Sequence, residues 1–256
     1  AGVVRLETID GAGRTVAVSE SAAGLATRVG QNYYDAAGQL RASEDAAGGR
    51  SYFFYDASGQ RIAEVDATGA AVAYRRDGLG RVVETLRFAE RVDTSAWLQS
   101  GEMAVAALDE QGFDPQLVRR STQTYDTAGR IVSQSDGVQT TVNVYDGAGR
   151  LVRSTTSAAG LTDRVNRYFY DDSSRLLATL DAAGYLAENQ YDAAGSLVRT
   201  VRYATATPLA QRETGTLAQL RPATSAADQV ERVFHDGLGR ETGTFTAKID
   251  TAAREL

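Results

Sequence analysis

The chain has 256 residues, a net charge of −6 and an apolar content of 43%, which is enough for a packed structure. It has no cysteine, so disulfides and Cys-based metal sites are excluded, and no basic stripe of the kind that nucleic acid requires is visible. No apolar run approaches the roughly 20 residues of a membrane span. The 25 glycines suit a β protein that is rich in turns.

One short motif recurs nine times and organises the chain, and such repeats decide the fold. Its clearest copy, at residues 145–152, reads Tyr-Asp-Gly-Ala-Gly-Arg-Leu-Val, and the aspartates Asp35, Asp56 and Asp77 lie 21 residues apart. A weaker copy occupies residues 10–14. In the remaining eight copies, which include the clearest one, the motif positions are Tyr34, Asp35, Gly38; Tyr55, Asp56, Gly59; Asp77, Gly80; Tyr125, Asp126, Gly129; Tyr145, Asp146, Gly149; Tyr170, Asp171; Tyr191, Asp192, Gly195; and Asp236, Gly239.

The motif predicts a strand that ends in a tight turn. Aspartate is favoured at the first position of a type I turn, where its carboxylate accepts backbone N–H groups, and glycine suits the left-handed position three residues later. Such a turn continues into a hairpin with a bulge. Aromatic and β-branched residues flank the turn, and a second turn often follows about ten residues later, as at residues 45–48, 66–69 and 181–184. We therefore predict an all-β fold of tandem hairpins that form a long antiparallel sheet, which curls because strands twist.

Two segments without the motif interrupt the array, at about 89–116 and 204–229. In the first, Asp93 or Thr94 can cap a helix, and Trp97, Val105 and Leu108 fall on one side of it at helical spacing. We expect this side to cover the sheet. A binding contact at Trp97 is the alternative.

The second interruption is predicted to be helical as well. Thr207 is a plausible N-cap with Pro208 at the first helical position. Leu209, Leu217 and Leu220 would supply apolar contacts. The pair Arg221-Pro222 would end the segment, and residues 225–228 resemble a short capping signal. Because similar strands precede both segments, we expect equivalent insertions at equivalent points.

The chain offers few residues suited to catalysis, and we expect no enzymatic activity and no cofactor. His235, the single histidine, occupies the tyrosine position of a repeat, where a strand residue is expected. The turn aspartates offer one carboxylate each, whereas Ca²⁺ takes six to eight oxygen ligands, so calcium binding is left open.

The pattern Tyr-Asp-x-x-Gly-Arg-Leu/Ile/Val at a period near 21 resembles the Rhs/YD-repeat family. That family includes bacterial Rhs polymorphic toxins, the B and C components of insecticidal toxin complexes, wall-associated repeat proteins and the animal teneurins. The resemblance covers nearly the whole chain outside the two insertions. It implies a sheet that spirals into a hollow shell, commonly around the chain's own C-terminal toxin. The family's Asp-Pro-x-Gly-Leu cleavage segment is not matched, since Asp114-Pro115 is followed by Gln116-Leu117.

The sequence thus predicts residues 1–256 to be a single repeat array and a fragment of a longer, secreted or bacterial cell-surface protein. Its partners would be further repeats of the same chain and an enclosed C-terminal toxin polypeptide, without nucleic acid. The alternative is a cell-surface adhesin that recognises glycan or a protein. Tyrosine-rich strands could stack sugars, but cross-strand aromatic pairs explain them equally well.

Overall fold

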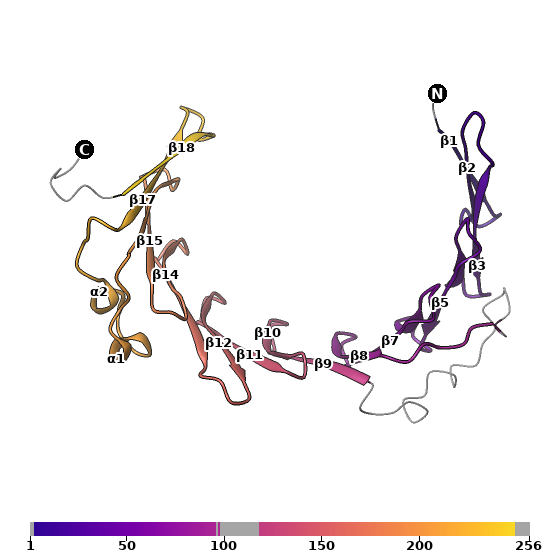
Figure 1. Cartoon of the computed structure of the whole chain (residues 1–256), viewed down its shortest axis with the longest axis horizontal. Coiled ribbons are helices and arrows are strands. Elements are labelled where there is room, and N and C mark those ends of the chain that lie inside the picture. Colours follow the sequence, from indigo (N-terminus) through magenta and orange to yellow (C-terminus); the bar gives the residue numbers. More distant parts are fainter. Residues whose placement is uncertain (1–2, 96, 98–117, 249–256) are drawn as a thin grey trace. The chain divides into compact units, whose positions relative to one another are not determined.

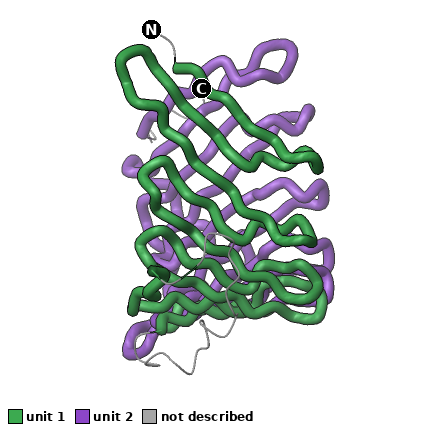
Figure 2. Tube along the Cα trace, turned by 90° about the vertical axis from the view of Figure 1, so that its right-hand side faces the viewer, with its two compact units in different colours: residues 1–124, 135–137 green, residues 125–134, 138–256 purple. Residues whose placement is uncertain are grey.

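The computed structural model describes residues 3–95, 97 and 118–248. Its described part is almost entirely β, with eighteen strands assigned to one antiparallel sheet and two short helices (Figure 1). This confirms the predicted fold class. The chain divides into two compact units, unit 1 (residues 1–124 and 135–137) and unit 2 (residues 125–134 and 138–256), which Figure 2 distinguishes by colour.

Unit 1 is a succession of hairpins in which each strand pairs with the next one in sequence. Each of these strands has five to eight residues. The strands are β1 Val4–Ile9, β2 Thr15–Ser21, β3 Arg28–Tyr34, β4 Leu40–Glu44, β5 Arg50–Tyr55, β6 Arg61–Val65, β7 Ala71–Arg76, β8 Val82–Phe88 and β9 Val118–Tyr125.

Unit 2 repeats this arrangement and adds two short helices between β16 and β17. Its elements are β10 Ile131–Ser135, β11 Gln139–Tyr145, β12 Leu151–Ala158, β13 Arg164–Tyr170, β14 Leu176–Leu180, β15 Leu186–Tyr191, β16 Leu197–Arg202, α1 Leu209–Arg212, α2 Leu217–Leu220, β17 Gln229–His235 and β18 Glu241–Lys248.

The hairpins that the motif closes carry the predicted bulge. In the β3–β4 hairpin, Tyr33 lies opposite Ala42 but Tyr34 lies opposite Leu40, so the register shifts by one residue at the motif tyrosine. The same shift occurs in other motif hairpins of both units, for example β11–β12 and β15–β16. A bulge of this kind bends the strand and places the tyrosine at the end of the ladder.

One face of the unit 1 sheet is apolar. Tyr52 and Phe54 of β5 are buried, and the intervening Phe53 points to the other face, as strand geometry requires. These two rings pack with small and aliphatic side chains of neighbouring strands and with Trp97. The buried cluster is Ala42, Tyr52, Phe54, Ala63, Val65, Ala71, Leu86, Phe88, Trp97 and Val118.

Unit 2 has its own, smaller core on one face of its sheet. It consists of Ala178, Leu180, Leu186, Val201, Tyr203 and Leu220, with Leu217 packed against it. Because Leu217 and Leu220 belong to α2, the insertion between β16 and β17 covers this face. The apolar contacts predicted for Leu217 and Leu220 are therefore confirmed.

Several details of the second insertion differ from the prediction. Pro208 is the N-cap of α1 and makes no side-chain capping bond, while the hydroxyl of Thr207 donates to the carbonyl of Leu220 at 2.8 Å. Thr207 is fully buried there, so its hydroxyl needs an internal partner and is not available as a cap. Leu209 is 77% exposed and supplies no core contact, unlike Leu217 and Leu220.

The remaining capping expectations were right in part. Helix α2 ends at Leu220, just before Arg221-Pro222, as expected. The capping signal at 225–228 closes a turn and not a helix: the N–H of Ser225 donates to Asp228 Oδ2 at 2.8 Å, and β17 begins one residue later.

The first insertion is described only as far as Trp97. Residues 93–95 and 97 are not helical, and Ser95 N–H donates to Asp93 Oδ1 in a local turn. The rest of the predicted helix, including Val105 and Leu108, lies outside the described residues.

Candidate functional site

In the repeated turn, both oxygens of the aspartate carboxylate have hydrogen-bond partners within the motif. In the turn after β11, Asp146 Oδ1 accepts the N–H groups of Ala148 and Arg150, and Asp146 Oδ2 is 2.7 Å from Arg150 Nε. The N–H of Gly149 donates to the carbonyl of Asp146, and Gly149 has φ of +84°. The same carboxylate–arginine pair closes five other motif turns, at Asp10, Asp77, Asp126, Asp171 and Asp236.

The motif arginine also reaches the next repeat. The guanidinium carbon of Arg150 lies 4.9 Å from the centre of the Tyr170 ring, and the hydroxyl of Tyr170 donates to the carbonyl of Leu151 at 3.0 Å. A guanidinium over an aromatic face is an attractive cation–π contact. Equivalent stacks join Arg14 to Tyr34, Arg130 to Tyr145 and Arg175 to Tyr191. We call this set of contacts the repeat junction.

Asparagine strengthens several repeat junctions. Asn143, two residues before Tyr145, donates from its side-chain amide to the carbonyl of Ile131, which also accepts from the Tyr145 hydroxyl. Asn32 and Asn189 make the corresponding bonds to Thr15 and Leu176. Neither the stacking of the motif arginine nor the asparagine bond was predicted from the sequence. The Asn-x-Tyr spacing before the motif was the available signal.

Glycine at the fourth turn position serves both the turn and the junction. A β-carbon on Gly149 would lie 2.9 Å from Nη1 of Arg130, the arginine of the preceding repeat. Ser174 is the one described non-glycine residue at positive φ, with φ of 63°, and its hydroxyl accepts from Arg150 Nη1 at 3.3 Å. Glycine in the other motif turns therefore avoids a strained backbone, and Gly149 also avoids a clash with the arginine.

Hydrogen bonds within the turns lower the pKa of several turn aspartates. Backbone N–H donation from Arg150 lowers the pKa of Asp146, with the Arg150 side chain adding to the effect. The pKa values of other turn aspartates are lowered by the same kinds of bonds, at Asp10, Asp56, Asp66, Asp77, Asp126, Asp171 and Asp236. Within the described residues, no three His, Asp or Glu side chains gather in a way that could hold a metal ion.

The repeats that lack part of the motif show what replaces it. Arg76 stands where most repeats have tyrosine, and its guanidinium donates to the carbonyl of Arg61, the equivalent of the carbonyl that the tyrosine hydroxyl reaches elsewhere. His235 ends β17 and is half-buried next to the Asp236 turn. Both residues lie at the repeat-junction position of their strands.

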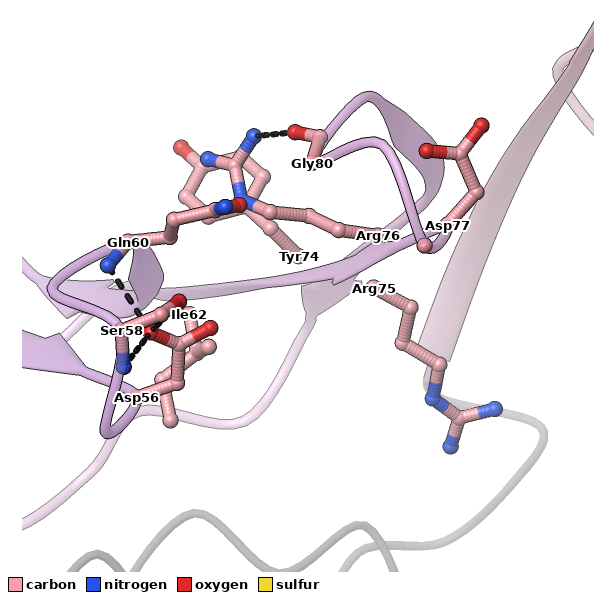
Figure 3. A pocket seen from close by; sticks show the side chains of 10 residues that line it. Asp56, Ser58, Gln60, Ile62, Tyr74, Arg75, Arg76, Asp77 and Gly80 are labelled. Carbon is pink, nitrogen blue, oxygen red and sulfur yellow. Dashed lines mark hydrogen bonds between the residues drawn. The ribbon is translucent and has the colours of Figure 1, made fainter.

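One junction in unit 1 is open. Gln60 stands where most repeats have the motif arginine, and Arg76 where they have the tyrosine, so no guanidinium–ring stack forms between them. A cleft of about 510 Å³ lies between the turns at Asp56 and Asp77 (Figure 3). Its lining includes Ser58 and Tyr74.

Trp97, the other candidate residue, is a packing residue in the structure. It is 7% exposed, and its ring meets the rings of Tyr52 and Phe54 edge-on, with centroids 4.7 and 5.9 Å apart. Edge-to-face aromatic pairs contribute beyond the area that they bury. The side chain is therefore not presented to a partner on the surface.

The strands, turns and repeat junctions define a tandem β-hairpin repeat protein. The family model of the RHS repeat matches residues 34–71 and again residues 55–90. The same motif, with the same junctions, continues through unit 2. The model thus identifies residues 34–90 as Rhs/YD repeats, and the resemblance seen in the sequence is confirmed.

Solved structures give more distant comparisons. A crystal structure of TcdB2-TccC3 is 15% identical with a TM-score of 0.43, covering 96% of this chain and 16% of that chain. TcdB2-TccC3 without its hypervariable C-terminal region is 14% identical with a TM-score of 0.28, covering 96% and 19%. A Photorhabdus luminescens Tc holotoxin pore is 13% identical with a TM-score of 0.22, covering 95% and 18%. The chain thus spans less than a fifth of the length of these solved chains.

Two further observations complete the comparison. Curated protein sequences give no match to the chain. None of the helices in the described part is both long enough and apolar enough to cross a membrane. The family assignment rests on the repeat model and the motif.

Proposed function

We propose that the chain is a non-catalytic structural segment of an Rhs/YD-repeat protein, whose hairpins form part of the wall of a hollow shell around a polypeptide. The observation that supports this proposal most strongly is the repeat junction. Asp146, Arg150 and Tyr170 use their charged and polar groups on one another and on backbone carbonyls. Chemistry of this kind ties each hairpin to the next, as an extended wall requires.

Curling of the sheet is part of the proposal. Long open sheets of more than about ten strands normally curl, split or close, because adjacent strands are rotated by about 20°. The bulge at each motif turn adds local twist at regular intervals. A curved wall also leaves fewer open strand edges, which otherwise favour aggregation.

The family resemblance also supports a proposal for the partners and the location. Further repeats of a longer chain would continue the wall, and the enclosed polypeptide would be a C-terminal toxin. Such a protein would be secreted or displayed on a bacterial surface. We propose no catalytic role for His235, because it takes the position of a junction tyrosine.

Protease protection of the longest natural protein that carries these repeats tests the proposal. The enclosed polypeptide should resist trypsin in buffer and be cut rapidly once urea opens the wall, while an added unfolded reporter protein is cut at once in both conditions. Equal cutting rates of the enclosed polypeptide in both conditions would contradict encapsulation. Small-angle X-ray scattering of the present chain adds a second test, because a compact solid globule is incompatible with a wall segment.

A further inference from the structure

The first and last strands are the most exposed strands of the described chain. Strand β1 pairs along its length with β2, and strand β18 pairs with β17. All six residues of β1 and six of the eight residues of β18 are exposed, whereas β5, which has a neighbour on each side, has no exposed residue. The second edge of each end strand therefore offers backbone N–H and C=O groups to a further strand.

The register between one repeat and the next is constant. The residue seven positions after a motif aspartate lies opposite the residue four positions before the next motif aspartate. Seven strand pairs show this register, and the partners are Ala17 and Gln31; Ala42 and Tyr52; Ala63 and Ala73; Glu84 and Thr122; Arg153 and Arg167; Ala178 and Glu188; and Arg199 and Arg232. The connections between these strands range from tight turns to the two long insertions, so the register does not depend on the connection.

The repeat junction accounts for this constancy. The hydroxyl of Tyr170 donates to the carbonyl of Leu151, which lies five positions after the preceding motif aspartate. Arg150 of the preceding repeat covers the same ring. Both contacts join groups on adjacent strands and require no covalent link between these strands. A strand from a second molecule can therefore take the same register.

From the two exposed edges and the constant register, we propose that β18 of one copy of this chain binds β1 of a second copy by strand addition. Gly243 is seven residues after Asp236, and Leu6 is four residues before Asp10, so Leu6 of the second copy lies opposite Gly243. Backbone hydrogen bonds supply the affinity in such a contact, and the side chains select the partner. Because the two edges differ, the copies join head to tail and continue the array. The inference rests on the proposed function as a wall segment and names a partner for its edges.

The side chains on the two edges fit this register. Val4 and Leu6 are each 64% exposed, and Phe245 is 59% exposed. The register places Val4 opposite Phe245, on the same face as Leu6. Because Gly243 has no side chain, Leu6 can lie over it and contact Phe245 diagonally. The contact thus covers three apolar side chains that the single chain leaves in water.

One half of a repeat junction is also present at the edge of β18. Arg240, the motif arginine next to β18, is 74% exposed, whereas Arg150, which lies over the ring of Tyr170, is 26% exposed. In the proposed contact, the tyrosine position belongs to Ile9 of the second copy, which is 63% exposed. Isoleucine covers the arginine stem but supplies neither a ring nor a hydroxyl, so this junction is weaker than a closed one.

Sedimentation velocity of the purified chain tests the contact. The weight-average sedimentation coefficient should rise as the concentration is raised from micromolar to millimolar. Ile9→Tyr supplies the missing ring and hydroxyl, and it should lower the dissociation constant about tenfold. A chain that stays monomeric over this range, both in its native form and as Ile9→Tyr, would overturn the proposal.

A double variant separates a repeat junction from general stickiness. Arg240→Gln removes the guanidinium and introduces the residue that Gln39 and Gln60 supply at the same position of other motif turns. It should cancel most of the gain that Ile9→Tyr brings. An equal gain from Ile9→Tyr with and without Arg240 would contradict the proposed contact.

Cysteine cross-linking tests the register, since the chain has no cysteine of its own. Copies with Val4→Cys are mixed with copies with Phe245→Cys in oxidised glutathione. The two thiols lose two electrons and two protons to one glutathione disulfide, which becomes two reduced glutathione molecules. Mass spectrometry of tryptic peptides should then find mainly the mixed dimer. Arg5→Cys, on the opposite face of β1, is the matched control for Val4→Cys and should give much less of it.

Equal yields from Val4→Cys and Arg5→Cys, or dimers that join two identical variants, would overturn the proposed register. Failure of the edge contact would leave the protease protection of an enclosed polypeptide unaffected. The edge contact and the proposed function therefore fail separately.

Discussion

Unit 1 and unit 2 each turn the chain back over one face of the sheet after equivalent strands. After β8, the N–H of Val92 donates to the carbonyl of Gly69 at 2.8 Å. After β16, the N–H of Thr207 donates to the carbonyl of Gly184, also at 2.8 Å. Both acceptors are turn glycines at positive φ. The same backbone bond therefore starts both insertions, as expected from the similar strands that precede them.

The two units differ in how the covering segment is held. In unit 1, Tyr52 and Phe54 receive the ring of Trp97. In unit 2, Arg167 takes the sheet position of Tyr52, and its guanidinium donates to the carbonyls of Arg212 and Gly215 at the end of α1 and beyond it. Burial lowers the pKa of Arg167.

A second polar contact in unit 2 has no counterpart in the described core of unit 1. Glu188 occupies the sheet position of Ala73, is 9% exposed, and accepts from the Tyr203 hydroxyl at 3.0 Å and from Arg221 at 2.8 Å. Burial and the neighbouring Glu188 carboxylate raise the pKa of Tyr203 to about 12, so its hydroxyl stays protonated as a donor. One backbone scaffold thus accepts an apolar cover or a hydrogen-bonded one, and a few side chains on the sheet face decide which.

The largest expected effect is the loss of the apolar anchor of unit 1. Trp97→Ala should lower the free energy of unfolding by about 3–4 kcal/mol, because it removes a buried indole and two edge-on ring contacts. Urea unfolding followed by circular dichroism measures the change. Trp97→Phe should lose markedly less, and a loss below about 1 kcal/mol in Trp97→Ala would show that the ring is not an anchor.

The matching experiment in unit 2 targets the polar anchor. Glu188→Gln should lower the free energy of unfolding by about 2 kcal/mol, because a buried carboxylate that accepts from Tyr203 and Arg221 is replaced by a neutral amide. The control is Glu231→Gln, which breaks the exposed pair with Arg202 and should cost at most about 0.5 kcal/mol. Equal effects of the two changes would remove the distinction between the two covers.

Both units contain the same motif turn, with glycine at its fourth position. Gly149→Val should destabilise the chain by about 1–3 kcal/mol, because a β-branched residue is strained at positive φ and would clash with Arg130. Ala148→Ser, at an exposed position of the same turn, should stay within about 0.5 kcal/mol of the native chain. Identical melting temperatures for both variants would refute the turn geometry.

The smallest expected effect is a gain at the motif turn that has Ser174 in place of glycine. Ser174→Gly should raise the free energy of unfolding by up to about 1 kcal/mol, because the strained left-handed conformation is relieved at the cost of one exposed hydrogen bond from Arg150. Ser173→Gly, one residue earlier, should bring no gain. A clear loss of stability in Ser174→Gly would mean that the hydroxyl contact outweighs the strain.

Much of this protein could be predicted from its sequence, because the controlling interactions are local. Each turn depends on residues within one motif, as at Asp146 and Gly149. Aspartate takes the first turn position, glycine takes the fourth position at positive φ, and the bulge follows. The period near 21 then sets the succession of hairpins, and the motif itself resembles a known family. None of this requires knowledge of distant contacts.

Only the tertiary structure decided what crosses from one repeat to another. The stack of Arg150 on Tyr170, the burial of Trp97 against Tyr52 and the polar support of Glu188 depend on strand register and on which face each residue occupies. The sequence does not distinguish an arginine that stacks on the next repeat from any other strand arginine. It also predicts Thr207 as a helix cap, whereas in the structure the buried hydroxyl donates to another acceptor. The open cleft arises in the same way, because Gln60 and Arg76 are unexceptional singly and meet only when successive hairpins pair.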